Sequence, residues 1–181
     1  MTDTLHIEIL PHLQVTPELD EKIDHLDHIA FNSEDDHDDP EFDSIRWASH
    51  DWMVLGWLDE TLVSQLCLLK REILVGGAPV WVVGIGGVAT HPDYQHRGLG
   101  SQIMAACPEF MAREIKVPFG LLICADETRP FYEKCGWQFV APSLFYSQDN
   151  ERRNLETCVM IFPLSAESWP AGEIDLCGAP W

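Results

Sequence analysis

Basic residues are scarce in this sequence. Its 181 residues include 11 Lys and Arg but 30 Asp and Glu, and the formal net charge is -19 at pH 7. Proteins that bind nucleic acid or anionic membrane surfaces present a basic face, so we expect neither as a partner. An excess of acid attracts cationic ligands, or serves only to keep the chain in solution. If the charge serves binding, the partner is a cation.

Long apolar runs and paired cysteines are also missing. No run reaches the roughly 18 apolar residues of a membrane span, and residues 1–10 lack the basic and apolar regions of a signal peptide. None of the six cysteines lies in a CxxC pair, and several lie in apolar runs such as LLICAD. Such thiols are typical of a reducing compartment, so we expect a cytoplasmic protein. Length and composition predict one globular domain over residues 1–181.

Apolar periodicity predicts the order of the elements. Residues 5–10 alternate as a strand, and Thr16 and Pro17 begin a helix as N-cap and first helical residue. The acidic segment 33–43 is expected to be a solvated loop, with Pro40 opening a short helix that ends near 47–50. Further ranges complete the prediction: strands at 52–58, 61–75 and 79–90, a helix at 98–116, a parallel strand at 119–124, a short helix at 128–136, strands at 137–140 and 155–163, and a surface tail at 165–181.

The loop from Gln95 to Gly100 carries the strongest chemical signal. It follows a predicted strand and opens a helix, where free backbone N–H groups and the helix dipole favour an anion. Gly98 and Gly100 let the backbone approach a diphosphate, and His96 and Arg97 add positive charge. The loop lacks the G-x-G-x-x-G spacing of a dinucleotide site and the Gly-Lys-Ser/Thr ending of a nucleotide triphosphatase. It therefore predicts a diphosphate site of another kind.

Two motifs in the right order resemble one enzyme superfamily. The segment GVATHPDYQHRGLGSQIM at 87–104 resembles the cofactor motif of the GCN5-related N-acetyltransferases (GNAT), and FYEKCGW at 131–137 resembles their downstream motif. The resemblance covers residues 55–140. It implies an α/β fold, with a mixed, mostly antiparallel sheet of six to seven strands and about four helices, and acetyl-CoA as cofactor. The two central parallel strands would splay apart to admit the pantetheine.

The resemblance also implies roles for single residues. The backbone of Val88, Ala89 and Thr90 would pair with pantetheine, and the N–H of Val88 would also stabilise the oxyanion. Tyr132 would protonate the leaving thiolate. The pyrophosphate would be held by the residues Gln95, His96, Arg97, Gly98, Leu99, Gly100 and Ser101.

The general base stays open at this stage. Related enzymes often carry Glu at the strand position that Gly86 fills here. The remaining candidates are Glu72, Asp126, Glu127 and the α-carboxylate of Trp181.

Within the superfamily, the chain resembles the aminoglycoside 2′-N-acetyltransferases in length, in an acidic stretch after the first helix and in a terminal Trp. This resemblance implies that a polycationic amine is bound by Asp35 or Asp36, Gly86, Gly87, Glu156 and Trp181. Gly86 in place of an acid and Ala179 in place of an Asp depart from it. Another amine metabolite, a peptide N-terminus and a non-catalytic acetyl-CoA sensor are the alternatives.

Two further expectations concern metals and assembly. The segments 24–28 and 35–39 mix His with Asp, but their spacing matches no zinc frame, so we expect no metal site. The seven tryptophans suit a core, a pocket or an interface, and an interface would make the protein a homodimer.

Overall fold

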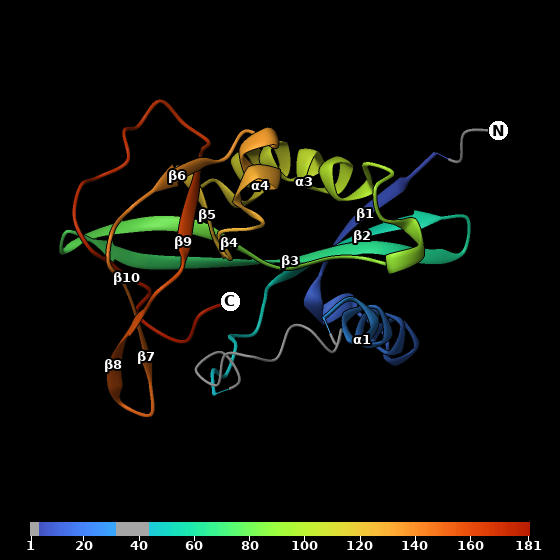
Figure 1. The fold of residues 1–181 in the computed structure, drawn as a ribbon, viewed down its shortest axis with the longest axis horizontal. Helices are drawn as coiled ribbons and strands as arrows, with labels where there is room; N and C mark the ends of the chain where they lie inside the picture. Colours follow the sequence, from blue (N-terminus) through green and yellow to red (C-terminus); the bar gives the residue numbers. More distant parts are fainter. Residues whose placement is uncertain (1–3, 32–43) are drawn as a thin grey trace.

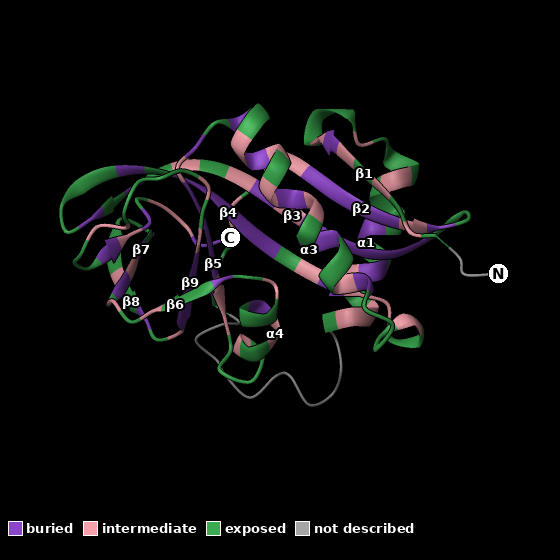
Figure 2. Cartoon of the chain, turned by 90° about the horizontal axis from the view of Figure 1, so that it is seen from above, coloured by how far each residue is buried: buried purple, intermediate pink, exposed green. Residues whose placement is uncertain are grey.

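The computed structural model describes residues 4–31 and 44–181, and it has one curled sheet with helices on both faces (Figure 1). Helices α3 and α4 lie on one face, and α1 lies on the other with the end of the chain. The central strands are largely buried, whereas the outer turns of α3 and α4 are exposed (Figure 2). The predicted mixed α/β fold is confirmed.

The first half of the sheet is an antiparallel meander. β1 (His6–Pro11) pairs with β2 (Trp52–Leu58), β2 pairs with β3 (Thr61–Val75), and β3 pairs with β4 (Ala78–Thr90). Tight turns connect the last three strands, and Gly76 and Gly77 in the second turn have φ of 58° and 81°. Left-handed residues at both centres match the right-handed twist of a hairpin. The predicted strands of this half are confirmed.

Helix α1 (Pro17–Phe31) covers this meander on one face. The hydroxyl of Thr16 accepts a hydrogen bond from the N–H of Leu19 at 3.3 Å, as expected of an N-cap. Ile23 and Leu26 pack against Met53 and Leu55 of β2. Short 3₁₀ turns stand before α1 (His12–Gln14) and after β4 (Pro92–Tyr94).

The second half of the sheet begins with a crossover. α3 (Leu99–Phe110) and a π-helical turn (Met111–Ile115) cross the opposite face and lead into β5 (Phe119–Cys124), which is parallel to β4. α4 (Arg129–Lys134) follows, and its end is marked by Gly136 at φ 89°. β6 (Gln138–Val140) and β5 both pair with β9 (Cys158–Pro163).

The C-terminal third differs from the expectation. β7 (Leu144–Gln148) and β8 (Glu151–Leu155) form a hairpin, so the strand predicted over 155–163 is in fact the end of β8 and all of β9. Asp149 and Asn150 take φ of 56° and 62°, the signature of a two-residue hairpin turn. The described residues hold ten strands and three α-helices, rather than six to seven strands and about four helices.

The tail does not lie loosely across the surface as predicted. β10 (Ile174–Asp175) pairs with β7 and with the end of β3, and Ile174 and Leu176 are completely buried. Of the expected second helix, Pro40 lies outside the described residues, and residues 44–50 are not helical. Apolar side chains of the tail are buried in a second core on one face of the sheet. This burial fixes the tail, although its Pro and Gly content predicted a loose surface segment.

Candidate functional site

The loop between β4 and α3 has the geometry of an anion site. Gln95 Nε2 donates to the Thr90 carbonyl at 3.2 Å, and His96 and Gly98 take left-handed φ of 59° and 76°. Gly98 is the N-cap of α3, and a Cβ at Gly98 would have no atom within 4 Å. The first helical hydrogen bond runs from the Gln102 N–H to the Gly98 carbonyl at 3.1 Å, so the N–H groups between them are free for a ligand.

Positive charge stands beside these amides. The Arg97 guanidinium lies 5.2 Å from the centre of the Tyr94 ring and is exposed. A Cβ added to Gly100 would lie 3.4 Å from both the Phe131 ring and the Thr90 hydroxyl oxygen. The structure thus brings the loop, the end of β4 and the start of α4 together.

The two parallel strands separate next to this loop. The register of β4 with β5 ends at Ile85 and Leu122, although β4 continues to Thr90. Gly87 and Val88 together oppose Leu66 of β3, and Gly87 has φ of 57°, so β4 carries a bulge at this point. A bulge bends a strand away from its neighbour. The edge of β4 beyond Ile85 is therefore open to β5, and the cradle fits an extended amide chain such as pantetheine.

Tyr132 lies on α4 and is nearly buried. Its ring makes an edge contact with Phe131 at 5.0 Å between centroids, and 9% of the residue is exposed. Burial raises the pKa of its phenol, and the thiols of Cys124 and Cys135 act in the same direction. Within the described part of the chain, no group hydrogen-bonds to this hydroxyl. The phenol therefore stays protonated and is free to donate.

On the opposite face of β4, Trp181 occupies the space above two glycines. A Cβ at Gly84 would lie 2.0 Å from Cε2 of the Trp181 indole, and a Cβ at Gly86 would lie 2.8 Å from the Trp181 carbonyl carbon. Arg71 lies 5.1 Å from the indole centre and donates to the Ala179 carbonyl at 2.6 Å. Glycine at both positions thus makes room for the tail beside the bulge.

A polar cluster that the sequence did not indicate lies next to Gly86. Gln65 of β3 is 1% exposed, and its Nε2 donates to Asp27 Oδ1 at 2.6 Å and to the Ile23 carbonyl at 3.3 Å. Its Oε1 is buried without a partner among the described residues. Burial raises the pKa of Asp27, while the Gln65 hydrogen bond lowers it and Asp24 raises it. A glutamine inside the apolar run LVSQLCLL was the one available signal.

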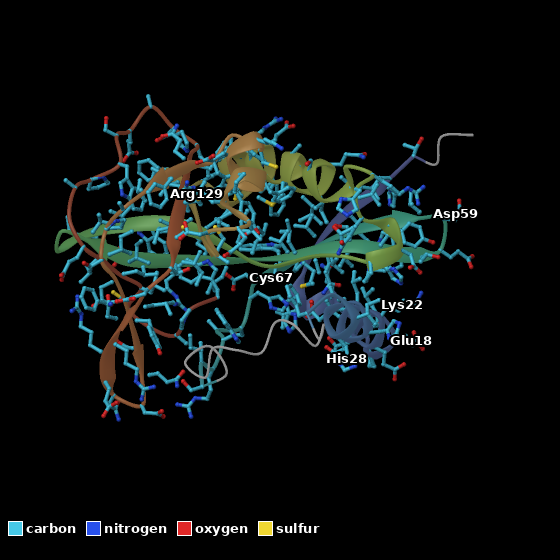
Figure 3. All side chains as sticks on the ribbon, viewed as in Figure 1. Glu18, Lys22, His28, Asp59, Cys67 and Arg129 are labelled. Carbon is cyan, nitrogen blue, oxygen red and sulfur yellow. The ribbon has the colours of Figure 1, made fainter. Side chains whose placement is uncertain are left out.

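Cys67 connects this cluster to the bulge. Its Sγ lies 3.4 Å from the Cβ position of Gly86 and 3.7 Å from that of Gly87. Burial raises the pKa of the Cys67 thiol to about 11, and Asp27 adds to the effect. Figure 3 shows Cys67 on the side of the sheet that α1 covers.

The remaining predicted substrate residues are Glu156, Asp35 and Asp36. Glu156 is exposed between β8 and β9, next to Thr157, whose hydroxyl donates to the Cys124 carbonyl at 2.9 Å. Asp35 and Asp36 lie outside the described residues.

A groove of about 590 Å³ runs between α1 and the turn from β2 to β3, with Glu18 and Lys22 on its helix side (Figure 3). Its other ionisable lining residues are Glu21, His25, Glu60 and His91. Within residues 4–31 and 44–181, no three His, Cys, Asp or Glu side chains are placed to hold a metal ion. No helix of this part is long and apolar enough to cross a membrane.

Comparison with known proteins agrees with this geometry. The family described as "Acetyltransferase (GNAT) domain" matches residues 15–140. Nodulation protein A of Bradyrhizobium elkanii is 27% identical over 154 residues, which are 74% of this chain and 70% of that protein.

Two solved structures share the fold. YhbS of Escherichia coli, a GNAT family N-acetyltransferase crystallised in complex with CoA, has a TM-score of 0.64 at 17% identity, over 98% of this chain and 93% of its own. Escherichia coli ElaA has a TM-score of 0.63 at 18% identity, over 87% of this chain and 99% of its own. The two structures show the shared fold, and the family match confirms the predicted enzyme class. The comparisons support the superfamily and not the aminoglycoside subgroup, so the chain belongs to the GNAT acetyltransferase family.

Proposed function

We propose that this protein transfers an acetyl group from acetyl-CoA to a primary amine of a small cationic substrate. The observation that carries the proposal is the open edge of β4 beyond Ile85, which leads directly to the free N–H groups at the start of α3. An extended chain of amides that ends in a diphosphate fits these two features together. When bound, acetyl-CoA supplies the activated acetyl group.

The chain's own residues have separate tasks. The backbone of Val88, Ala89 and Thr90 aligns the pantetheine arm, and the N–H of Val88 stabilises the oxyanion. Residues 95–101 hold the pyrophosphate, with Arg97 as the mobile cation. Tyr132 donates its proton to the departing thiolate, a role that its raised pKa supports because the phenol stays protonated at neutral pH.

The net charge and the acidic groove support a cationic acceptor. The chain carries a formal net charge of -19, and three glutamates, Glu18, Glu21 and Glu60, line the groove beside α1. Several ammonium groups leave water at low cost only where carboxylates pair with them. Aminoglycosides and polyamines both carry several ammonium groups, so both suit this site as acceptors. The homodimer stays a prediction, which sedimentation velocity tests.

Thiol release from acetyl-CoA tests the proposed reaction. The panel consists of kanamycin A, spermidine, glucosamine, L-lysine and an alanyl peptide. We expect the wild-type protein to release CoA in proportion to an acetylated amine and to prefer the polycations. Binding of CoA without turnover of any amine would instead identify a non-catalytic sensor.

The pyrophosphate site is tested at Gly98. Gly98→Asp places a negative charge at the N-terminus of α3 and should raise the KM for acetyl-CoA at least about tenfold, because the anion is repelled where the helix dipole attracts it. Gly98→Asn is the matched control, since Asn tolerates the left-handed backbone and carries no charge. Equal KM values for the two variants would contradict the assignment.

The acid is tested at Tyr132. Tyr132→Phe removes only the hydroxyl and should lower kcat about 100-fold, while the Kd for CoA measured by calorimetry stays within about twofold. Tyr146→Phe, on β7 and also buried, is the control and should keep the wild-type kcat. An undiminished kcat in Tyr132→Phe would show that the proton comes from elsewhere.

A further inference from the structure

We propose that Asp27 binds the ammonium group of the acceptor and takes its proton, and that Gln65 is the positioning residue for the Asp27 carboxylate. The proposal rests on the proposed function and deepens it, because it names the base that the reaction needs. It is carried by the cluster of Asp27, Gln65 and Cys67 beside the glycines of the β4 bulge.

Asp27 approaches the bulge from α1. Cys67 Sγ stands 3.4 Å from the Cβ position of Gly86, and Asp27 lies near enough to Cys67 to act on the charge of its thiol. Because residues 86 and 87 are glycines, β4 carries no side chain at these two positions. The acid that the family resemblance places on β4 is therefore absent, and the carboxylate of Asp27 reaches the neighbouring part of β4 from α1 through Gln65, which pairs with Ala89.

The three carboxylate side chains considered from the sequence are badly placed, whereas the main-chain carboxyl of Trp181, whose carbon lies 2.8 Å from the Cβ position of Gly86, is the rival base. Glu72 is exposed and lies five residues beyond Cys67 on β3, roughly 16 Å along an extended strand. The side chain of Asp126 is 79% exposed and lies 3.6 Å from Arg129. Glu127 is exposed on the same turn as Asp126. Among these side chains, only that of Asp27 is half-buried and hydrogen-bonded to Gln65, which pairs with Ala89 of β4 beside the bulge.

The amide of Gln65 can hydrogen-bond to the Asp27 carboxyl in both of its protonation states. Its Nε2 donates to Asp27 at 2.6 Å, which suits the ionised acid, while its buried Oε1 has no partner in the described part of the chain. Rotation of the amide end presents Oε1 to the O–H of a protonated Asp27. A buried acceptor without a donor is costly, so an amide that is half satisfied in one state indicates a second state that uses its oxygen.

The proton moves from the ammonium group of the acceptor to the carboxylate of Asp27. An N–H bond of the ammonium breaks, its electron pair stays on nitrogen, and the proton passes to the second carboxylate oxygen of Asp27. The neutral nitrogen is the nucleophile that the proposed reaction requires. Asp24 on α1 and Cys67 on β3 are the titratable groups that face Asp27 among the described residues, and burial raises the pKa of Asp27 toward that of a useful base.

The experiment compares pH profiles of kcat/KM for the panel amine that the wild-type protein acetylates fastest. With Asp27 as base, kcat/KM should be flat from the pKa of Asp27 up to the pKa of the amine. Asp27→Asn should lower kcat/KM about 100-fold at pH 7 and change the plateau to a line that rises tenfold per pH unit, because only the free amine then reacts. The KM for acetyl-CoA should not change.

Three further variants separate catalysis from folding. Asp24→Asn, an exposed neighbour on the same helix, should keep the height of the wild-type plateau within about twofold and move only its lower limb to lower pH, because Asp24 raises the pKa of Asp27. Asp27→Asn keeps an acceptor oxygen for Gln65, so its unfolding temperature should not fall. Gln65→Met removes the N–H that lowers the pKa of Asp27, so the lower limb of its profile should move to higher pH. Asp27→Glu should restore part of the plateau.

The outcomes distinguish the two proposals. A plateau of wild-type shape in Asp27→Asn overturns the role of Asp27 and leaves the acetyltransferase proposal standing. If the wild-type protein turns over no amine of the panel, the proposed function fails, and the role of Asp27 fails with it.

Discussion

Gly84 lies directly beneath the indole of Trp181, and one added methyl group there should unseat the C-terminal segment. The Cβ of an alanine would lie 2.0 Å from Cε2 and 2.1 Å from Nε1 of the indole. Gly84 pairs with Leu69 of β3 on one side and Leu121 of β5 on the other, so its backbone is held in place. Because the strand does not yield, the indole must move.

The expected loss follows from the burial of Trp181. The residue is 6% exposed, and removing a buried Trp side chain costs about 3–5 kcal/mol. Gly84→Ala should lose most of this stabilisation. About 0.4–1 kcal/mol of the loss is offset, because alanine restricts the unfolded chain more than glycine does. A loss of about 3 kcal/mol corresponds to a fall in Tm of about 6–12 °C for a chain of this size.

A double-mutant cycle by urea unfolding tests the reasoning. Trp181→Ala empties the space above Gly84, so Gly84→Ala should cost little in that background. The sum of the two single losses should therefore exceed the loss in the double variant by about 3 kcal/mol. Gly56→Ala, where the Cβ meets a Leu5 methyl at 3.3 Å, is the strand control and should cost under about 1 kcal/mol. Additive losses, or a loss below 1 kcal/mol in Gly84→Ala, would refute the clash.

Two further predictions concern ionisation. The folded-state pKa of Asp27 is raised, so the stability that it contributes is present below its unfolded pKa near 3.8 and is lost as the pH rises through the folded value. Asp27→Asn should therefore be more stable than the wild type at pH 7, with a difference that shrinks toward pH 3.8 in urea unfolding; a constant difference would contradict the shift. Burial raises the pKa of Cys67 to about 11 and that of Cys107 to about 12, so iodoacetamide at pH 8 should modify exposed Cys177 first, as mass spectrometry would show. Modification of Cys67 as fast as Cys177 would count against its burial.

Much of the fold could be predicted because its signals are local. The strands of the β1–β4 meander, the N-cap at Thr16 and the helix stop at Gly136 follow from periodicity and from residues within one turn of the feature. The hairpin of β7 and β8 was missed, although Asp149-Asn150 is a turn signal of the same local kind. The apolar residues on either side of that turn are too few for periodicity to separate two short strands.

The candidate site likewise has a local part, which the sequence predicted, and a non-local part, which it did not. The loop at 95–101 and the motif around Tyr132 are contiguous in sequence, so the sequence alone predicted the cofactor and the enzyme class. The residues around Gly86 come from α1, β3 and the C-terminal segment, and no spacing in the sequence indicates that they meet.

The sequence by itself therefore indicated the acetyltransferase family, because the two motifs that resemble this family, at 87–104 and 131–137, are each one short contiguous segment. Only the tertiary structure decided which residues surround the bulge of β4. Trp181 enters because glycine leaves room at 84, and Asp27 meets Gln65 because α1 packs across β3. Both contacts depend on how distant apolar surfaces are buried against each other, and that burial is decided by the whole fold.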